Sequence, residues 1–517
     1  MADHVVLYLM RHKIQKRRYD DMVKAARNRN FKLCDNFSPE VTHVVTEFDT
    51  YEQAQRHLNN SSICSEYRPE FLNISWFTES IKARKPVEIT ERHRLPREQS
   101  TQTVEELESE TRFPEWACQR SAPLKHHNEF LTSPLEILEE YAEMKDGDSD
   151  YSRALAFRRA SCVLKSLPFR VSSIRQLRDV KDIGAHCTRV INEILEDGLC
   201  TEVQDIVTSD WFKKMQLFTQ VFGIGPTTAK KWIERGWMSI KEAQDSPDIS
   251  KDWRVQWGLA FHDDLMNPVK SNEALQFTQM IKTEAEKILP GIIVQLTGGF
   301  RRGKHQGHDI DILFSHPNED KEVGFLSKLL NRLEKLGMIL CGSLEASTFH
   351  EKILREDYKL SARGQLDHFE KWLGICKLPK DSDYTPMKLV MDSQEICESS
   401  KDADSIEDYQ SKAKKQRQCQ GEKCPFTIAN SKRDWTARRV DFILSPYSQY
   451  FYALVGWTGS KHFNRDLRLY SQKVLNRKLT SHGLHDFKSN MNIPATSEKE
   501  VFDNLNIQYQ EPENRNC

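Results

Sequence analysis

The sequence has 517 residues, of which 38% are hydrophobic and 29% carry a charge. A chain this long exceeds the size at which a single hydrophobic core stops growing, so we expect three or more domains. The longest apolar runs, such as residues 292–296 and 452–455, are far shorter than the roughly 20 residues that cross a bilayer, and no signal-type hydrophobic stretch opens the sequence. Neither membrane insertion nor secretion is therefore expected.

The formal net charge is −1 and the 12 cysteines are scattered. Because no Cys or His cluster has the spacing of a zinc site, we expect reduced thiols in a nuclear or cytosolic compartment. The overall charge gives no support for nucleic-acid binding, which must rest on local basic patches, and each patch alone is more typical of a solvated face. Basic residues gather around Arg17 and Arg18, at Arg301 and Arg302, and on a candidate helix with Lys461 and Arg468.

Residues 1–96 alternate predicted strands with helices, which indicates a small α/β domain. The order resembles that of a BRCT domain, in which a buried tryptophan of the last helix anchors the fold, and Trp76 holds that position here. Residues 97–115 are polar and acidic without apolar periodicity, as expected of a linker. The elements expected in the first domain are strand 5–10, helix 19–29, strand 42–46, helix 51–59 and a last helix that opens at residue 74.

Two glycine turns interrupt the helical periodicity of residues 116–267. The first contains Gly184, and the second, with Gly223 and Gly225, reads Val-Phe-Gly-Ile-Gly-Pro. Since glycine has no side chain to block approach, such a turn exposes backbone N–H groups at a helix N-terminus to a DNA phosphate. An ordinary helix-capping turn is the alternative, but the complete Phe-Gly-Ile-Gly pattern favours a DNA-binding helix-hairpin-helix.

From residue 268 the pattern changes to strands that alternate with helices, typical of an α/β domain. Asp309 and Asp311 lie two apart in a predicted strand and so point to one face, whereas Ile310 and Ile312 point towards a core. Asp441 stands in a second, otherwise apolar strand, where a carboxylate is costly unless it is paired or metal-bound. Three carboxylates on two neighbouring strands predict a two-metal site for phosphoryl transfer.

The residues before the Asp-x-Asp pair decide its meaning, since the pair alone also occurs in sugar-nucleotide transferases and in surface turns. Gly298 and Gly299 form a predicted turn with open backbone donors, and Arg301 and Arg302 add guanidinium groups that suit a triphosphate. A phosphate cradle just ahead of metal carboxylates indicates nucleotidyl transfer rather than a simple metal site.

Several motifs together resemble the family X DNA polymerases over nearly the whole chain. They are Gly-Gly-Phe-Arg-Arg-Gly-Lys, Gly-His-Asp-Ile-Asp, the Arg-Val-Asp strand and Gly-Trp-Thr-Gly-Ser at residues 456–460. The resemblance implies a DNA polymerase with a multidomain α+β fold. Its expected parts are a BRCT-like domain (1–96), a linker (97–115), a helical DNA-binding domain (116–200), a fingers-like helix-hairpin-helix domain (201–267), a palm (268–444) with a disordered insertion (380–433), and a thumb-like domain (445–517).

The resemblance also implies roles for individual residues. The catalytic residues, which would hold Mg²⁺ with Mn²⁺ as a working substitute, are Asp309, Asp311 and Asp441. Nucleotide binding would fall to Gly298, Gly299, Arg302, His308, Gly456, Trp457, Lys461 and Asn464. DNA would contact Gly184, His186, Arg189, Gly223, Gly225 and Arg468, and a monovalent cation beside the primer strand would bind the carbonyls of Thr219, Val221 and Ile224.

Two positions have physical consequences of their own. Glycine at position 456 leaves space where a bulkier side chain would meet a ribose 2′-hydroxyl, which predicts poor discrimination against ribonucleotides; a turn-capping glycine is the alternative. Alignment on Gly184 places Val190 where lyase members of the family have a Schiff-base lysine, and valine is no nucleophile. We therefore expect the helical domain to hold a downstream 5′-phosphate without lyase activity.

The balance between templated and untemplated synthesis stays open at this stage. The histidine before the aspartates and the Gly-Trp pair are typical of a branch of the family that includes both kinds of enzyme. Residues 481–484 favour templated gap filling, whereas residues 347–349, residues 366–369 and Lys371 favour a template-independent terminal deoxynucleotidyltransferase. The segment between residues 349 and 366 resembles a loop that stands in for a missing template strand.

Gap filling in double-strand break repair by non-homologous end joining implies a nuclear enzyme that binds DNA and deoxynucleoside or ribonucleoside triphosphates. The BRCT-like domain would dock on the Ku heterodimer and the ligase IV complex, with Arg17 and Arg18 as part of the contact. A non-catalytic end-joining scaffold is another class, against which the intact aspartates argue. A nucleotidyltransferase acting on RNA or a small molecule has no reason to keep two hairpin turns.

Overall fold

The computed structural model describes residues 5–12, 14, 16–48, 50–59, 69–95, 97, 113–178, 180–246, 252–350, 367–380 and 424–517. The chain forms two compact units. The first contains residues 1–113 with 171–207, and the second contains residues 114–170 with 208–517. Most of the expected linker (97–115) and of the expected insertion (380–433) lies outside the described residues.

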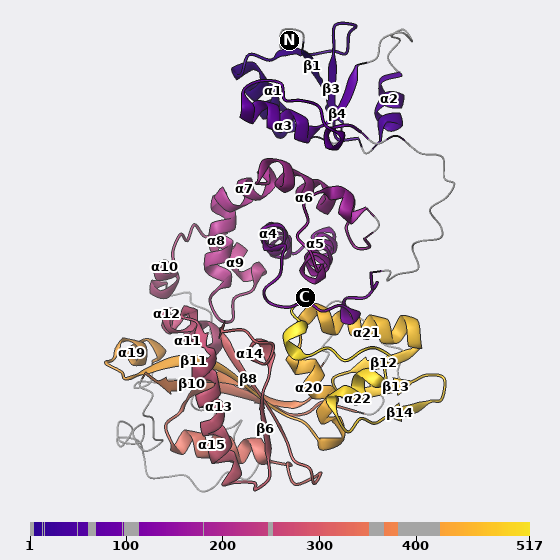
Figure 1. The fold of residues 1–517 in the computed structure, drawn as a ribbon. Helices are drawn as coiled ribbons and strands as arrows, with labels where there is room; N and C mark the ends of the chain where they lie inside the picture. The colour runs from indigo at the N-terminus through magenta and orange to yellow at the C-terminus, as the bar shows by residue number, and fades with distance from the viewer. Residues whose placement is uncertain are drawn as a thin grey trace. The chain divides into compact units, whose positions relative to one another are not determined.

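The N-terminal part of the first unit alternates strands and helices (Figure 1): β1 (Val6–Leu9), α1 (Lys16–Asn28), β2 (Lys32–Cys34), β3 (His43–Thr46), α2 (Tyr51–Asn59), β4 (Glu70–Asn73) and α3 (Ile74–Ala83). The four strands form a parallel sheet with the order β2-β1-β3-β4. Leu7 and Leu9 of β1 pack with α1 and α3, whereas Val44 of β3 packs with Ala54 of α2. Helices therefore cover both faces, as a parallel sheet requires.

Trp76 anchors α3 in this unit. Its side chain is fully buried, and its indole nitrogen donates a hydrogen bond to the carbonyl of Val87 at 3.0 Å. The arrangement is the expected BRCT-like α/β fold. The strands β2 and β4, which are three and four residues long, have no counterpart in the predicted elements. The first unit also contains η3 (Ile174–Leu177), α6 (Ala185–Asp197) and α7 (Thr201–Thr208).

Helices dominate the first part of the second unit: η2 (Ala117–Gln119), α4 (Glu129–Lys145), α5 (Asp148–Ser166), α8 (Asp210–Thr219), α9 (Pro226–Glu234), α10 (Ile240–Asp245), α11 (Trp253–Ala260) and α12 (His262–Met266). An ion pair between Arg158 and Glu139 at 2.6 Å joins α5 to α4. Thr227 of α9 donates a hydrogen bond to Asp146 at 3.1 Å, directly after α4. The α8–α9 hairpin is thus fixed to the helical pair.

A five-stranded mixed sheet forms the centre of the second unit. Its strands in spatial order are β6 (Ile293–Leu296), β8 (Asp309–Ser315), β11 (Trp435–Leu444), β10 (Glu370–Pro379) and β9 (Ile339–Glu345). The β8–β11 pair is parallel, and the other neighbouring pairs are antiparallel. The helices α13 (Ser271–Glu286) and α15 (Phe325–Lys335) lie on one face, and α19 (Pro425–Asn430) precedes β11.

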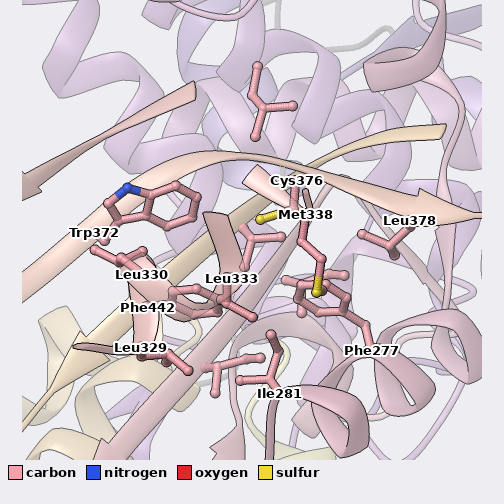
Figure 2. Packing of buried hydrophobic residues seen from close by; sticks show 14 of the residues in the cluster. Phe277, Ile281, Leu329, Leu330, Leu333, Met338, Trp372, Cys376, Leu378 and Phe442 are labelled. Carbon is pink, nitrogen blue, oxygen red and sulfur yellow. The ribbon is translucent and has the colours of Figure 1, made fainter. Parts of the chain in front are cut away.

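Figure 2 shows how this face is filled. Phe277 of α13 packs in one cluster with Trp372 of β10 and Phe442 of β11. Ile310 and Ile312 of β8 belong to the same cluster and are fully buried, as the alternation in the sequence predicts. Since neighbouring residues of a strand point to opposite faces, the residues between these isoleucines face away from the core.

The opposite face of the sheet is covered by the C-terminal part of the chain. Leu313 and Ile443 pack there against Tyr450 and Ala453 of α20 (Tyr450–Thr458). The C-terminal part continues with α21 (Lys461–Leu475), β12 (Arg477–Thr480), β13 (Gly483–Asp486), β14 (Met491–Ile493), α22 (Glu498–Asp503) and η5 (Pro512–Asn514). A further short pair, β5 (Val269–Lys270) with β7 (Gln306–Gly307), flanks the five-stranded sheet.

Candidate active site

Three aspartates lie on one face of the five-stranded sheet. In the parallel pair of β8 and β11, Asp441 is opposite Asp311, and Arg439 is opposite Asp309. Because side chains alternate along each strand, all three carboxylates point away from the cluster that contains Ile310. The register of two strands that are far apart in the sequence therefore brings the predicted catalytic residues together.

Burial makes these carboxylates costly to ionise. Burial raises the pKa of Asp441 to about 6, and the charge of Asp309 adds to the rise while Arg439 and Lys371 oppose it. Burial also raises the pKa of Asp311 well above its usual range, with the charges of Asp309 and Asp441 acting in the same direction. Such repulsion in a poorly solvated site is what a divalent cation relieves.

Arg439 lies on the same face as the aspartates, so its positive charge bears on whether they can bind a metal ion. Its Nη2 lies 3.8 Å from Oδ2 of Asp309, whose side chain is 44% exposed. Within the described ranges, no three His, Cys, Asp or Glu side chains already stand close enough together to hold an ion. The donor set nevertheless fits divalent cations, since carboxylate oxygens are their preferred ligands and the Asp309 side chain is partly exposed.

A four-residue helix, α14 (Gly298–Arg301), lies directly against Asp311. The N–H and the hydroxyl of Thr297 donate hydrogen bonds to the Asp311 carbonyl at 2.8 and 3.1 Å. A Cβ at position 298 would lie 2.1 Å from Oδ2 of Asp311, and the φ of 62° also favours glycine there. The double glycine predicted as a turn instead opens a four-residue helix, in which Gly298 has a positive φ.

Arg301 is locked to the C-terminal part of the chain by a buried cluster. Its two terminal nitrogens donate to Glu498 at 2.9 and 2.7 Å, and the fully buried Arg515 donates to the same carboxylate at 2.8 Å. Burial alone would raise the pKa of Glu498, but the hydrogen bonds and charges of the two arginines lower it to about 2. This cluster fixes α14 against α22.

Arg302, the predicted triphosphate ligand, is positioned by backbone and amide groups. It donates to the carbonyl of Thr458 at the end of α20, and its Nε donates to Oδ1 of Asn516 at 3.1 Å. Burial lowers its pKa, and the charges of Asp311 and Asp309 oppose the fall. The guanidinium therefore belongs to the same electrostatic site as the aspartates.

Hydrogen bonds connect α21 to Gly456 and to Ser481. The amide of Asn464 on α21 donates to the Gly456 carbonyl at 2.6 Å, and Arg468, one turn further, donates to Oγ of Ser481 at 3.2 Å. A Cβ at position 456 would lie 2.5 Å from that same Oγ. Close packing against Ser481 therefore favours glycine at position 456, in addition to the predicted need for space beside a ribose 2′-hydroxyl.

The side chains of three other predicted nucleotide ligands make few close polar contacts. The indole N–H of Trp457 is buried and has no hydrogen-bond partner among the residues that the structure describes. Lys461 is 77% exposed and lies 3.5 Å from Glu143. His308 lies 3.4 Å from the carbonyl oxygen of Leu265 through Nδ1.

The second glycine turn joins α8 to α9. The N–H of Ile224 donates to the Val221 carbonyl at 2.9 Å, and Thr219 closes α8. Gly223 has a φ of 89°, and a Cβ there would lie 2.8 Å from a side-chain atom of α11, whereas a Cβ on Gly225 would meet nothing within 4 Å. Gly223 therefore makes the turn possible, and Gly225 leaves the N-terminus of α9 open to a phosphate.

The first glycine turn precedes α6 and has a carboxylate beside it. A Cβ on Gly184 would meet nothing within 4 Å. His186 and Arg189 both contact Oε2 of Glu202, at 2.9 and 2.8 Å. Val190 is fully buried, so the position aligned with the lyase lysine is part of the core. A DNA phosphate at this turn must compete with Glu202 for the two basic side chains.

The two arginines predicted to bind a protein partner differ in exposure. Arg18 is 5% exposed and forms ion pairs with Glu47 at 2.5 Å, Glu196 at 2.8 Å and Asp197 at 3.0 Å. Arg17 is 63% exposed and pairs with an aspartate of α7. Arg17 is therefore the one of the two that lies at the surface of the first unit.

Known protein families match most of the chain. The matching models are a helix-hairpin-helix domain (residues 128–200), the fingers domain of DNA polymerase lambda (216–266), the DNA polymerase beta palm (269–447) and the DNA polymerase beta thumb (453–516). The chain is also 35% identical to human DNA-directed DNA/RNA polymerase mu, over 99% of this chain and 94% of that relative. The chain belongs to the family X DNA polymerases.

Two relatives with another name are nearly as similar to this family X polymerase. The DNA nucleotidylexotransferases of Xenopus laevis and human are 33% and 31% identical to it, each over 99% of this chain and 93% of the relative. It is accordingly an enzyme that adds nucleotides to DNA with the help of divalent metal ions. Among the described residues, no helix is long and apolar enough to span a membrane.

Three parts of the site are not among the residues predicted from the sequence. Arg439 lies two residues before Asp441 in the same strand, so the alternation of side chains could have placed it on the face of the aspartates. Ser481 and Glu498 had no such signal, because each meets its partner, Gly456 or Arg301, only through the packing of distant segments.

Proposed function

We propose that this family X polymerase extends DNA primer 3′ ends by two-metal catalysis and fills short gaps during non-homologous end joining. The observation that carries the proposal is the strand register that sets Asp309, Asp311 and Asp441 on one face, directly beside α14. Carboxylates next to a phosphate cradle suit nucleotidyl transfer better than any simple metal site.

The roles follow from the position of each group. Two Mg²⁺ ions, for which Mn²⁺ can substitute, would stabilise charge on the attacking and leaving oxygens when bound to the carboxylates. Asp441 would help the primer 3′-hydroxyl to lose its proton. The incoming nucleotide would be surrounded by Gly298, Gly299, Arg302, His308, Gly456, Trp457, Lys461 and Asn464.

The two glycine turns would hold the DNA on either side of the gap. The carbonyls of Thr219, Val221 and Ile224 would hold a monovalent cation, which would offset the charge of a primer phosphate. The first turn, with His186 and Arg189, would bind the downstream 5′-phosphate, and Arg468 would face the nascent base pair. The open N-termini of α6 and α9 support this arrangement.

Ribonucleotides would be accepted as well as deoxyribonucleotides. The absence of a side chain at position 456 supports this part of the proposal, and so does the similarity to a relative named as a DNA/RNA polymerase. Because Ser481 lies where a Cβ of residue 456 would point, the open space depends on both residues.

A template-independent terminal transferase is the second candidate, and one group of contacts favours it. Ser347 and Thr348 bond to the carbonyl of His368 at 2.8 and 3.0 Å, and the ring of Phe349 stacks on His482 at 4.4 Å. His482 also accepts a hydrogen bond from the backbone of His368 at 2.9 Å. The residues that flank the segment predicted to replace a template are thus bonded to each other, and both flanks contact His482.

The cellular setting is also part of the proposal. The BRCT-like domain would dock on the Ku heterodimer and the ligase IV complex in the nucleus. Arg17 is the residue of the basic patch that can take part, since Arg18 is buried by three carboxylates.

The test is primer extension by the full chain with Mg²⁺ and, separately, with Mn²⁺. The DNA is a gapped duplex with a downstream 5′-phosphate, the same gap with a 5′-hydroxyl, or the bare primer, each with deoxyribonucleotides or ribonucleotides. We expect the fastest extension on the phosphorylated gap and similar rates with both sugars. Equal rates on the bare primer would favour the terminal transferase, and no incorporation with either metal would favour the scaffold.

A further inference from the structure

Two cysteines that are far apart in the sequence meet at one cavity. Cys162 lies near the end of α5, and Cys517 follows η5. Both are free thiols, and both line a cavity of about 400 Å³ together with residues of α4, α5 and the start of α21. Each thiol affects the pKa of the other, raising that of Cys162 and lowering that of Cys517, so the two side chains lie near each other at this cavity. No movement of a whole domain is needed to bring the two sulfurs together.

We propose that Cys162 and Cys517 form a reversible disulfide bond when a low-molecular-weight disulfide, such as oxidised glutathione, reacts with the protein. The bond would join α5 of the helical segment to the C-terminal part of the chain, which contacts the nucleotide cradle.

The surroundings assign different roles to the two sulfurs. The neighbouring Cys162 and the hydroxyl group of Ser460, whose Oγ lies 3.8 Å from Sγ of Cys517, lower the pKa of the Cys517 thiol even though burial opposes the shift. Cys517 is also the less buried of the two, whereas Cys162 is 1% exposed. Cys517 is therefore the nucleophile that meets the oxidant, and Cys162 is the resolving thiol.

The reaction is a two-step thiol–disulfide exchange. The Cys517 thiolate attacks one sulfur of oxidised glutathione, so that a mixed disulfide forms and one glutathione thiolate leaves. Cys162 then attacks Sγ of Cys517, its proton passes to the departing thiolate, and the second glutathione is released. Two protein thiols lose two electrons in all, and one small disulfide is reduced to two thiols.

Cys517 is in direct contact with groups that the proposed function uses. Its carbonyl accepts a hydrogen bond from the hydroxyl of Ser460, which caps α21. Its neighbour Asn516 binds Arg302 through both the guanidinium and the carbonyl, at 3.1 and 3.2 Å. Fixing Cys517 to α5 would hold the start of α21, the helix that carries the proposed DNA contact Arg468, so the oxidised protein should release DNA more slowly. This consequence, unlike the disulfide itself, rests on the proposed function.

The other cysteines offer controls. Burial raises the pKa of the Cys187 and Cys200 thiols to about 11, so they should react slowly. Cys424 is exposed, so a serine there removes a reactive thiol without touching the cavity. Cys424→Ser is therefore the matched variant for Cys162→Ser and Cys517→Ser.

The experiment treats the full chain with oxidised glutathione and analyses unreduced peptides by mass spectrometry. We expect a Cys162–Cys517 cross-link in the wild type and in Cys424→Ser, its loss after dithiothreitol, and its absence from Cys162→Ser and Cys517→Ser. Cys162→Ser should instead retain glutathione on Cys517. A wild-type protein that keeps glutathione on Cys517 without the cross-link, or that leaves Cys517 unmodified, would overturn the proposal.

Stopped-flow release of a labelled gapped duplex tests the consequence separately. Oxidation should slow release from the wild type and leave Cys162→Ser unchanged. A cross-linked protein that releases DNA at the reduced rate would refute the link to DNA binding. Because the peptide readout needs no polymerase activity, failure of the proposed function would leave the result on the disulfide intact.

Discussion

Replacing Glu498 with glutamine should weaken the join between α14 and the C-terminal part of the chain. The variant keeps the shape of the side chain but leaves Arg301 and the fully buried Arg515 without their counter-charge. The pKa of Glu498 falls from 4.5 to about 2, which corresponds to about 3 kcal/mol in favour of the ionised form. Only 9% of the side chain is exposed, so solvent screening reduces this value little.

Buried ion pairs in general give a similar free energy, because removing one partner of such a pair costs about 3–5 kcal/mol. Glu498 lies in the second unit, residues 114–170 with 208–517. With an unfolding entropy of about 2.1 cal/mol/K per residue, 3 kcal/mol lowers the melting temperature of a unit of that size by about 4 °C. Because Arg301 neighbours the proposed triphosphate ligand Arg302, the KM for the incoming nucleotide should rise in the same variant. Thermal unfolding followed by circular dichroism and steady-state primer extension measure the two effects.

The stability difference between the wild type and Glu498→Gln should also depend on pH. A carboxyl whose pKa is lowered in the folded state stabilises the protein above its unfolded pKa, here about 4.5, and that contribution is lost as the pH falls towards about 2. The difference between the wild type and Glu498→Gln should therefore be full at pH 7 and shrink below pH 4.5. Glu511→Gln, an exposed glutamate near the same cluster, is the control. Equal melting temperatures of the wild type and Glu498→Gln at pH 7 would refute the reasoning.

Three further variants test the nucleotide and DNA contacts. Asn464→Ala removes the hydrogen bond to the Gly456 carbonyl, worth about 1 kcal/mol, and should raise the KM for the incoming nucleotide about fivefold in steady-state kinetics; an unchanged KM would contradict a positioning role. Gly456→Ala should lower extension with both sugars because its Cβ meets Ser481, and Ser481→Gly should restore it; full activity of the single variant would exclude the clash. Arg189→Ala should weaken the preference for a downstream 5′-phosphate in fluorescence anisotropy, whereas Glu202→Gln, which removes the competing charge, should strengthen it; the reverse order would argue against this phosphate site.

The parts of the site that follow a local period were predictable from the sequence. The two-residue spacing of Asp309 and Asp311 fixed their common face, and the isoleucines between and after them marked the core. The glycine turns before α6 and α9 and the helix around Trp76 were equally visible, because each depends on residues that are near one another in the chain.

The parts that depend on distant segments were not predictable in this way. Nothing near Gly456 in the sequence indicates that Ser481 fills the space beside it, and the basic patch with Arg17 and Arg18 gave no sign that Arg18 is buried. The double glycine was expected to form a turn with open backbone donors, but it opens α14, where the positive φ of Gly298 and its close contact with Asp311 require glycine. Tertiary packing decided each of these cases.

The most direct test of the account is single-turnover incorporation of one nucleotide by Asp441→Ala in the presence of Mg²⁺. Asp263→Ala, which removes a fully exposed aspartate outside the site, is the control. We predict that Asp441→Ala binds primer–template DNA with nearly wild-type affinity but does not incorporate the nucleotide, while Asp263→Ala behaves as the wild type. Incorporation by Asp441→Ala at the wild-type rate would contradict the assignment of the three aspartates as the catalytic group.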